Sequence, residues 1–577
     1  MKWVVTSAWP YVNTVPHLGN MVGSVLSADV FARYLRMRGH EVVFVSGSDE
    51  HGTVIEVEAI KKGIHPKQLT DQAHEYIVKL WREWGISFDN YSRTESPVHK
   101  DFVRSLMMKI YSNGYMESRS QIVPYCPRDG IYLPDRFIRG ICPYCGAPDA
   151  RGDQCDRCGR LLDPQDLVSP QCVFCGSRPV FKARRHWFFR LDKLESKILN
   201  WVLNNECLDE NVRNFTVSWI KSGLSPRSVT RDNKWGIKAP FPGANDKTIY
   251  VWFDALLGYV SATIEFFMRR GEGERWKEFW MNPDARTSFF IGKDNIPFHS
   301  VILPAMLLAS NDSYVLPTII SATEYLMFEG QKFSKRRRVG VWIDEALKIV
   351  SEADYWRYAL IRMRPEDRDT NFKWVEFIRI TNSELNDHIG NFIHRVLTLI
   401  WKHFKGRIPE VTRLDPLDRE FNESIDRSWE SYTAYMNRAR LRAASDVVVK
   451  LAEKGNKYLN RKAPWARVKE SVDEAGTALG LCFKASLYIA VMLYPIMPRL
   501  ALRVLRMMNV EVREAPLIIK QPTELIKEGH RISRPSPPFK KLSRGLIKLL
   551  SSEEELAEFI NKVREEVVKE RPEFLRP

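Results

Sequence analysis

The sequence predicts an α/β fold in which a parallel sheet is split by a cysteine-rich insertion and followed by an all-helical region. Short apolar runs alternate with helical stretches in residues 1–115 and again after residue 231, as in parallel sheets covered by helices. Seven of the nine cysteines lie between Cys126 and Cys175. From about residue 379 the pattern becomes helical. The 577 residues allow several domains of roughly 100–200 residues each.

The first half of the predicted sheet begins with the apolar pair Val4–Val5, and the helix Met21–Arg38 follows it. Val42–Val45 is a second buried strand by composition, and the loop after it carries Asp49. Ligands of such sheets bind at the carboxyl ends of the strands. We therefore expect His17 and Asp49 to lie at that edge.

The alternation resumes beyond an insertion at residues 116–230, which is rich in cysteine, proline and glycine. Three further strands are expected, at Thr248–Phe253, Ser288–Ile291 and Thr318–Ile320. Together with the first half they form one nucleotide-binding sheet that the insertion interrupts.

The helical region begins with an apolar stripe at steps of four, three, four and three residues, which marks one buried helix face. Its members are Leu385, Ile389, Phe392, Val396 and Leu399. Lys402, Lys405 and Gly406 close that helix, as basic residues and glycine do at a carboxyl end.

A last helix is predicted after a proline-rich linker, starting at the capping box Ser552–Glu555. Its apolar stripe consists of Leu556, Phe559, Ile560, Val563 and Val567. We expect this helix to fold back on the body of the protein, and docking of a partner is the alternative.

Composition indicates packed domains and a polyanionic partner. Hydrophobic residues make up 44% of the chain, so a disordered protein is excluded. The net charge of +16 and the pI near 9.3 favour binding of a polyanion, with a basic but inert surface as the alternative. The longest apolar run, Leu487–Met497, falls short of the ~20 residues of a membrane helix. We expect no membrane span and a cytoplasmic location.

The cysteines form C-x-x-C knuckles, which place thiolates on tight turns in the geometry of a closed zinc site. Disulfides are the alternative, and cytoplasmic location disfavours them. The first expected structural zinc site consists of Cys142, Cys145, Cys155 and Cys158. A second is expected from Cys126, Cys172 and Cys175, with Asp129 in the last place of its knuckle.

Two short motifs carry the functional prediction. His17-Leu18-Gly19-Asn20 stands where a strand turns into a helix, and Lys332-Phe333-Ser334-Lys335-Arg336 lies on a glycine-flanked loop. A histidine at a helix start and mobile lysines suit the binding of phosphates. Each motif alone also has a plain reading, as a helix-capping histidine or as a solvated or RNA-contacting loop.

Longer strings make the pattern specific: AWPYVN at 8–13, SGSDEHGT at 46–53, YVWFDALLGY at 250–259 and IGKDNIPFH at 291–299. With them the chain resembles the methionyl-tRNA synthetases, a class I aminoacyl-tRNA synthetase family, and most of all their archaeal type. The two motifs then correspond to the family's HIGH and KMSKS signatures. The match runs in order from Trp3 to about residue 540.

The resemblance implies a methionine–tRNA ligase with a Rossmann-type sheet. The carboxylate of methionine would attack the α-phosphorus of Mg²⁺-bound ATP, and the methionyl group would then pass to the 3′ end of tRNA(Met), for initiation and elongation of protein synthesis. Positioning and charge stabilisation would supply the rate.

The resemblance also implies roles for individual residues. The catalytic set is His17, Asn20, Lys332 and Lys335. ATP would be bound by His17, Gly19, Asn20, Gly292, Asp294 and Lys335. Methionine would be bound by Trp9, Tyr11, Asp49, Trp252, Tyr259 and His299, although each aromatic could instead be a core residue. The CAU anticodon would be read by Asn391, Arg395 and Trp465, with a core tryptophan as the alternative for the last.

The implied domains are two sheet halves at 1–115 and 231–325, the insertion at 116–230, a KMSKS-loop and stem-contact region at 326–378, an anticodon-binding domain at 379–520 and a linker with the last helix at 521–577. No appended oligonucleotide-binding module is expected. The chain departs from the family at Asn20, where many relatives carry histidine, at Arg336, where the motif has serine, and at Leu256, where proline is usual.

Two other classes of function remain as alternatives. A general nucleotidyltransferase would share the histidine motif and the sheet, but it would lack the helical domain and the Trp252–Tyr259 string. A zinc-containing RNA-binding paralogue without catalysis would not need both His17 and Lys335.

Overall fold

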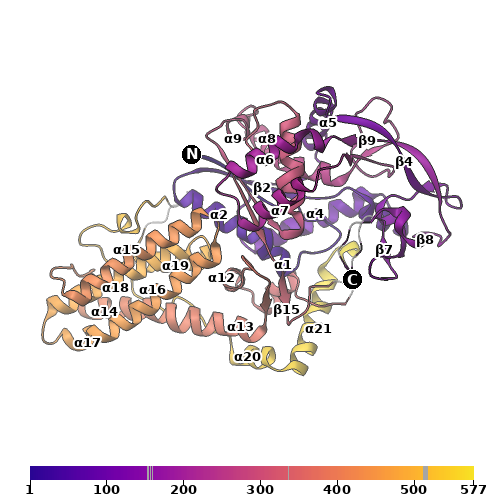
Figure 1. Ribbon diagram of the computed structural model, residues 1–577. Helices are drawn as coiled ribbons and strands as arrows, with labels where there is room; N and C mark the ends of the chain where they lie inside the picture. Colours follow the sequence, from indigo (N-terminus) through magenta and orange to yellow (C-terminus); the bar gives the residue numbers. More distant parts are fainter. Residues whose placement is uncertain are drawn as a thin grey trace.

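The structure is a computed structural model that describes residues 1–152, 155, 157–158, 160, 162–334, 337–510 and 518–576. Its centre is a parallel sheet of five strands in the order β14-β13-β1-β2-β3 (Figure 1), which confirms the predicted fold class. The strands are β1 (Lys2–Ser7), β2 (Glu41–Ser48), β3 (Asn90–Arg93), β13 (Arg286–Gly292) and β14 (Ile319–Thr323).

Side chains alternate between two cores, one on each face of the sheet. Val5 on β1 packs in the core that contains α2 (Leu26–Met37) and α4 (Pro66–Glu83). Its neighbour Val4 belongs to the core of the other face. The first core continues into the helical region, so the sheet and that region share one apolar interior.

The helices around the sheet include the expected one after the histidine motif. It is built of α1 (Leu18–Asn20), the π-helical η1 (Met21–Val25) and α2 in direct succession. The other helices around the sheet are α3 (Thr53–Lys62), α5 (Pro97–Ser112), α8 (Val251–Arg269), α9 (Lys277–Trp280), η5 (Lys293–Asn295), η6 (Phe298–Ile302) and α10 (Leu303–Ala309).

The predicted strand at Thr248–Phe253 is wrong beyond its first two residues. Thr248–Ile249 forms β12, which pairs antiparallel with β11 (Thr230–Arg231) outside the main sheet. Helix α8 then begins at Val251 and is buried on most of its surface, so its apolar run carries no alternation that would tell a strand from a core helix. The fifth strand of the sheet is instead β3, whose polar sequence gave no apolar signal.

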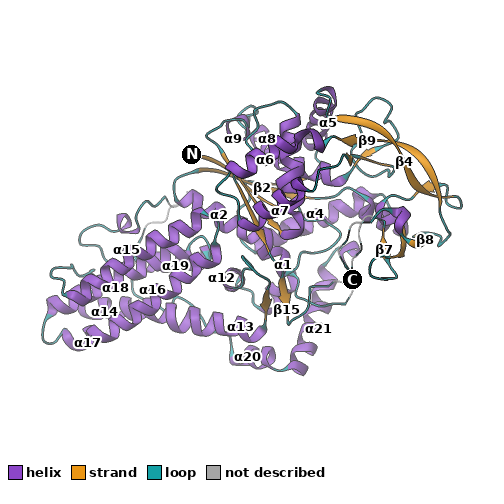
Figure 2. Cartoon of the chain, viewed as in Figure 1, coloured by secondary structure: helices purple, strands orange, loops and turns teal. Residues whose placement is uncertain are grey.

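The insertion is a long antiparallel ribbon with two helices (Figures 1 and 2). The ribbon pairs β4 (Met116–Cys126) with β9 (Val180–Phe189). The cysteines gather in a small core beside it. Its remaining elements are β5 (Ile131–Tyr132), η2 (Asp135–Phe137), β6 (Ile138–Ile141), β7 (Ala150–Arg151), η3 (Pro164–Asp166), β8 (Val168–Cys172), η4 (Leu191–Leu194), α6 (Glu195–Asn204), α7 (Glu210–Lys221) and β10 (Arg227–Ser228).

A bundle of long helices extends from the sheet on the side opposite the ribbon (Figure 1). The predicted apolar stripe lies inside it, on η7 and α14, and helix α14 ends at Phe404 with Lys405 in the left-handed conformation. The connecting elements are β15 (Leu326–Phe328), α11 (Ile343–Ile349), α12 (Ala353–Arg362), β16 (Thr370–Phe372) and α13 (Trp374–Ile378). The bundle contains η7 (Arg379–Gly390), α14 (Asn391–Phe404), α15 (Pro416–Asn437), α16 (Leu441–Lys462), α17 (Pro464–Arg467), α18 (Val472–Leu493), α19 (Pro498–Met507) and η8 (Pro522–Leu525).

Two helices, α8 and α18, are long and apolar enough to cross a membrane by length and composition. They are core helices here, because 72% and 94% of their apolar windows are buried inside the protein.

The chain ends in α20 (Arg544–Ser551), α21 (Glu553–Glu570) and η9 (Glu573–Leu575). Ser552 caps α21 as predicted, with its side chain accepting a hydrogen bond from the backbone N–H of Glu555. Helix α21 lies against α11, and η9 lies against α4. The prediction that the last helix folds back on the body is thus confirmed.

Candidate active site

His17 caps the start of the helix that follows β1, and one edge of its ring faces the backbone of the first helical turn. Its Nδ1 accepts a hydrogen bond from the backbone N–H of Asn20 at 3.2 Å, and the Asn20 side-chain oxygen accepts one from the His17 N–H at 3.2 Å. Since Nδ1 is an acceptor here, the proton of the neutral ring resides on Nε2. Asn20 therefore holds the histidine in one tautomer.

The ring of His17 stacks on Phe333 from the lysine-rich loop, with centroids 4.3 Å apart and planes 10° apart. Gly19 makes room for this pair, because a Cβ atom there would come within 3.0 Å of the His17 ring. Gly340 does the same on the loop side, because its φ is +129° and a Cβ atom would lie 2.3 Å from Phe333. The two signature segments are in direct contact through aromatic rings.

Backbone hydrogen bonds hold the base of the lysine-rich loop beside the same helix start. Leu18 N–H donates to the Val341 carbonyl at 3.1 Å. Within the loop, Ser334 and Val339 exchange two hydrogen bonds of 2.9 and 3.0 Å. Lys335 and Arg336 lie outside the described residues.

Burial under Phe333 lowers the pKa of His17 to about 4, because the charged ring loses hydration. The residue as a whole stays partly exposed. At neutral pH His17 is therefore an uncharged hydrogen-bond donor in the free protein.

Tyr325 links Asp294, which is expected to bind the adenosine, to Lys332 of the lysine-rich loop. Tyr325 O–H donates to both carboxylate oxygens of Asp294, at 2.7 and 2.8 Å. The Lys332 ammonium lies 4.6 Å from the centre of the same ring, and that of Lys293 lies 4.0 Å from it. Gly292 ends β13 with open space where a side chain would stand. Asp294, Gly292 and Lys332 thus occupy one edge of the sheet.

The aromatic residues expected around methionine form two groups, and the rings within each group contact one another. Tyr11 meets the Trp252 ring edge-to-face at 6.3 Å, and Trp252 stacks on Phe298 at 4.1 Å. Tyr11 pairs with Asp49 through the backbone at the end of β2, so the carboxylate and these rings belong to one location. Tyr11 and Trp252 remain partly exposed, as a ligand-binding wall requires.

Trp9, Tyr259 and His299 form the deeper group. The Tyr259 hydroxyl lies 2.7 Å from His299 Nε2, and His299 Nδ1–H donates to the Asn295 carbonyl at 2.9 Å. The His299 ring is therefore neutral and accepts from the tyrosine, in accord with a pKa that burial lowers to about 4.

Trp9 packs so closely on two glycines that a Cβ atom at Gly47 or Gly258 would come within 2.6 or 2.5 Å of its ring. Trp9 is only 9% exposed. It therefore forms the base of this region and is a core residue as well.

Asp49 is the best candidate for binding a cation. It is 3% exposed, and its Oδ1 has no hydrogen-bond partner among the described residues. Burial, followed by repulsion from Asp254, raises its pKa well above the ordinary value. A bound ammonium group would relieve both costs.

A buried network that the sequence analysis missed lies behind Asp49. His51 contacts Asp254 at 2.6 Å and Glu95 at 2.8 Å, and His99 contacts the second Asp254 oxygen at 2.6 Å. Burial opposes the charge on His51, but Asp254 and Glu95 outweigh it and raise its pKa to about 10. His51 and Asp254 belong to the strings SGSDEHGT and YVWFDALLGY. Their place in these strings was the sequence signal that could have predicted the network.

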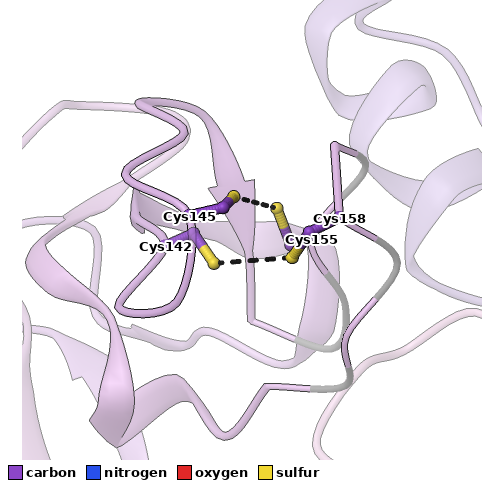
Figure 3. Close-up of side chains that lie close together, drawn as sticks. All are labelled: Cys142, Cys145, Cys155 and Cys158. Atoms are coloured by element: carbon purple, nitrogen blue, oxygen red, sulfur yellow. Dashed lines mark hydrogen bonds between the residues drawn. The ribbon is translucent and has the colours of Figure 1, made fainter.

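The predicted cysteine sets both come together as clusters that could hold a metal ion, with ligand atoms within 4.8 Å of one another. In the first cluster Cys142 lies 3.9 Å from Cys158, and Cys145 lies 3.7 Å from Cys155 (Figure 3). A tetrahedron with Zn–S bonds of about 2.3 Å has edges of about 3.8 Å, so the donor set fits zinc. All nine cysteines are free thiols, which excludes the disulfide alternative.

The second cluster contains a carboxylate at its centre. Asp129 Oδ2 lies 3.2 Å from the Cys126 sulfur and 3.0 Å from that of Cys172. Cys175 completes the set at 3.4 Å from Cys126. The Ser177 hydroxyl, which sequence analysis missed, lies 2.9 Å from Cys175.

The residues expected to read the anticodon lie on the surface of the helical bundle. Arg395 donates to the Asn460 side chain at 3.0 Å, and its guanidinium lies 5.4 Å from the centre of the Trp465 ring. Asn391 is exposed one turn before Arg395 on α14. Trp465 is 39% exposed, because Ala463 turns the chain in a left-handed conformation just before Pro464. The core alternative for Trp465 is excluded.

Comparison with known proteins agrees with this geometry. A family model described as "tRNA synthetases class I (M)" matches residues 3–397, and one described as "Anticodon binding domain of methionyl tRNA ligase" matches residues 408–548.

Among similar proteins, a methionine–tRNA ligase of Ignicoccus hospitalis is 55% identical over 99% of this chain and all of its own length. One of Aeropyrum pernix is 54% identical over the full length of both chains. Among solved structures, methionyl-tRNA synthetase of Mycobacterium tuberculosis bound by methionyl-adenylate has a TM-score of 0.75 at 22% identity, covering 93% of this chain and 100% of that one. This last likeness concerns the fold.

The low pKa of His17 leads to a testable prediction. In protein with isotope-labelled histidine, the His17 ring resonances should show no titration between about pH 5.5 and 8, because the neutral form persists down to a pKa of about 4. The variant His17→Asn identifies the resonances by their loss. An inflection near neutral pH in the free protein would contradict the buried, neutral ring.

Proposed function

This chain belongs to the class I methionyl-tRNA synthetases and is a methionine–tRNA ligase, and we propose which of its residues perform the reaction. The observation that carries the assignment is the stacking of His17 on Phe333, 4.3 Å apart. It brings the histidine motif and the lysine-rich loop to one place, as a site that acts on a single triphosphate requires.

Methionine binds with its ammonium group at Asp49 and its side chain against Tyr11 and Trp252. The buried carboxylate oxygen of Asp49, which has no hydrogen-bond partner in the described part of the chain, supports the first contact. The partly exposed rings support the second, because an unbranched thioether packs well on aromatic edges.

ATP binds across the sheet edge, with adenosine at Gly292 and Asp294 and its phosphates between His17 and the lysine-rich loop. A methionine carboxylate oxygen attacks the α-phosphorus, and the bond from that phosphorus to the bridging oxygen of the β-phosphate breaks. Pyrophosphate leaves with the bond's electrons. His17 Nε2–H donates to the phosphates, and Lys332 and Lys335 neutralise the charge on the leaving group. Magnesium enters with ATP and supplies charge neutralisation.

In the second step a ribose hydroxyl of the terminal adenosine of tRNA(Met) attacks the methionyl carbonyl carbon. The ester forms, AMP leaves, and the hydroxyl proton passes to solvent or to the departing phosphate. The helical bundle selects the tRNA through Asn391, Arg395 and Trp465, of which the last two already contact each other. We assign the protein to the cytoplasm, where its tRNA substrate is used.

The cysteine clusters support two structural zinc ions in the insertion. Cys142, Cys145, Cys155 and Cys158 hold one, and Cys126, Asp129, Cys172 and Cys175 hold the other. The core around them is small, and Cys126, Cys142, Cys155 and Cys172 are part of it, so a metal would supply the stability that a small insertion lacks.

Methionine-dependent exchange of pyrophosphate into ATP tests the assignment of the first step. We expect the parent protein to catalyse it, and His17→Ala to lower its kcat by about 100-fold, as loss of one transition-state hydrogen bond does. His65→Ala is the matched control, because His65 likewise caps a helix, α4, through its ring nitrogen. Equal activity of the two variants would contradict the role of His17.

The role of Trp465 predicts a separation of the two steps. Trp465→Ala should lower kcat/KM for charging of tRNA(Met) by about 10-fold or more, since one stacked base is worth about 1–3 kcal/mol. Pyrophosphate exchange should stay at the parental rate. Trp401→Ala, which removes a similarly exposed tryptophan from the far end of α14, is the control. Equal losses in charging and exchange would refute the assignment.

Metal analysis tests the zinc sites. Purified protein should contain about two zinc ions per chain. The pair substitution Cys142→Ser and Cys145→Ser should remove one ion, and Cys172→Ser and Cys175→Ser should remove the other. A single zinc in the parent, unaffected by the second pair, would eliminate the second site.

A further inference from the structure

The last long helix, α21, lies along the segment that follows the lysine-rich loop (Figure 1). Its stripe residues Ile560, Val563 and Val567 are buried in the main core. Phe574 and Leu575, just beyond the helix, are buried in the same core. One face of the helix is thus part of the packed body, most of its polar residues are exposed, and Arg564 and Glu570 contact the segment after the loop and α11.

Ion pairs with α11 fasten the end of α21. Arg571 donates to both oxygens of Asp344 on α11, at 2.7 and 2.8 Å, and it is 6% exposed. Tyr76 on α4 donates to the same carboxylate at 3.1 Å. Lys348 pairs with Glu570 at 2.7 Å on the surface. These contacts fix the helix without touching the loop.

Arg564 is the residue of α21 that reaches the loop. Its Nη2 donates to the carbonyl oxygen of Gly340 at 2.6 Å. Its Nε lies 3.6 Å from the Glu345 carboxylate, and its guanidinium lies 5.7 Å from the centre of the Trp342 ring. A charged donor on a carbonyl is among the stronger hydrogen bonds of proteins, so Arg564 holds this carbonyl firmly.

The Gly340 carbonyl belongs to the short segment that connects the loop with the histidine motif. Phe333 fills the space where a side chain of Gly340 would stand. The next residue, Val341, accepts the backbone hydrogen bond from Leu18. The one after it, Trp342, pairs with His17 through the backbone. A shift of Gly340 would therefore move Phe333 relative to His17.

We propose that Arg564 is a positioning residue for adenylate formation, which keeps the lysine-rich loop in register with His17 by holding the carbonyl of Gly340. This inference rests on the proposed role of the loop in binding ATP. It assigns to the C-terminal helix a function in the first step of the reaction, in which no tRNA takes part. Arg564 touches neither of the two predicted substrate-binding sets directly.

The test compares Arg564→Met, which keeps the length of the side chain and removes its donors, with Lys348→Met, which breaks an ion pair of the same helix away from the loop. For Arg564→Met we expect kcat of pyrophosphate exchange to fall about tenfold or more, because small displacements of catalytic groups are costly, with KM for methionine unchanged. Arg564→Lys should recover part of the rate, since an ammonium can still donate to Gly340. Lys348→Met should match the parent.

Hydrogen exchange gives a reading that does not depend on activity. The amides of Leu18, Ser334 and Val339 should exchange faster in Arg564→Met than in the parent, and at the parental rate in Lys348→Met. If the parent fails to exchange pyrophosphate, the proposed function fails, while the amide protection still decides the role of Arg564. Parental kcat together with parental protection in Arg564→Met, or the same loss in Lys348→Met, would overturn the inference.

Discussion

The contact on which the site depends is the stacking of His17 on Phe333. It joins two segments from opposite ends of the catalytic region, and each accommodates it with a glycine, Gly19 on one side and Gly340 on the other. The same contact determines the chemistry of the histidine, because burial of the ring lowers its pKa to about 4 and leaves a neutral donor. Phosphates bound here would accept a hydrogen bond from the fixed His17 Nε2–H, and the lysine-rich loop would supply positive charge.

The sheet and the helical bundle explain why this contact can be precise. One apolar core runs from one face of the sheet through α11 and α12 into the bundle, and the last helix packs on it. The buried Arg357 on α12 pairs with Asp29 on α2 at 2.6 Å, which ties the sheet's helix to the connecting region. The catalytic groups lie on separate elements of the sheet and the connecting region. A single apolar core that joins these elements keeps the groups within hydrogen-bond distance of one another.

Sequence reasoning recovered the parallel sheet, both cysteine clusters and the helical bundle, because periodicity and C-x-x-C spacing are local signals. It misread the residues after Ile249, where a mostly buried helix shows no alternation, and it missed β3, whose polar residues look like a loop. The roles of Phe333, Tyr325 and Arg564 were missed for another reason. Each acts through a partner far away in the chain, and no single sequence reveals such a pairing.

If the site works as described, one nucleotide occupies the space between His17 and the lysine-rich loop. A crystal structure with methionine and a non-hydrolysable ATP analogue would show where that nucleotide binds. We expect the α-phosphate within hydrogen-bond distance of His17 Nε2 and the adenosine beside Gly292 and Asp294. A nucleotide bound away from His17, with the loop turned to a separate cavity, would contradict this expectation.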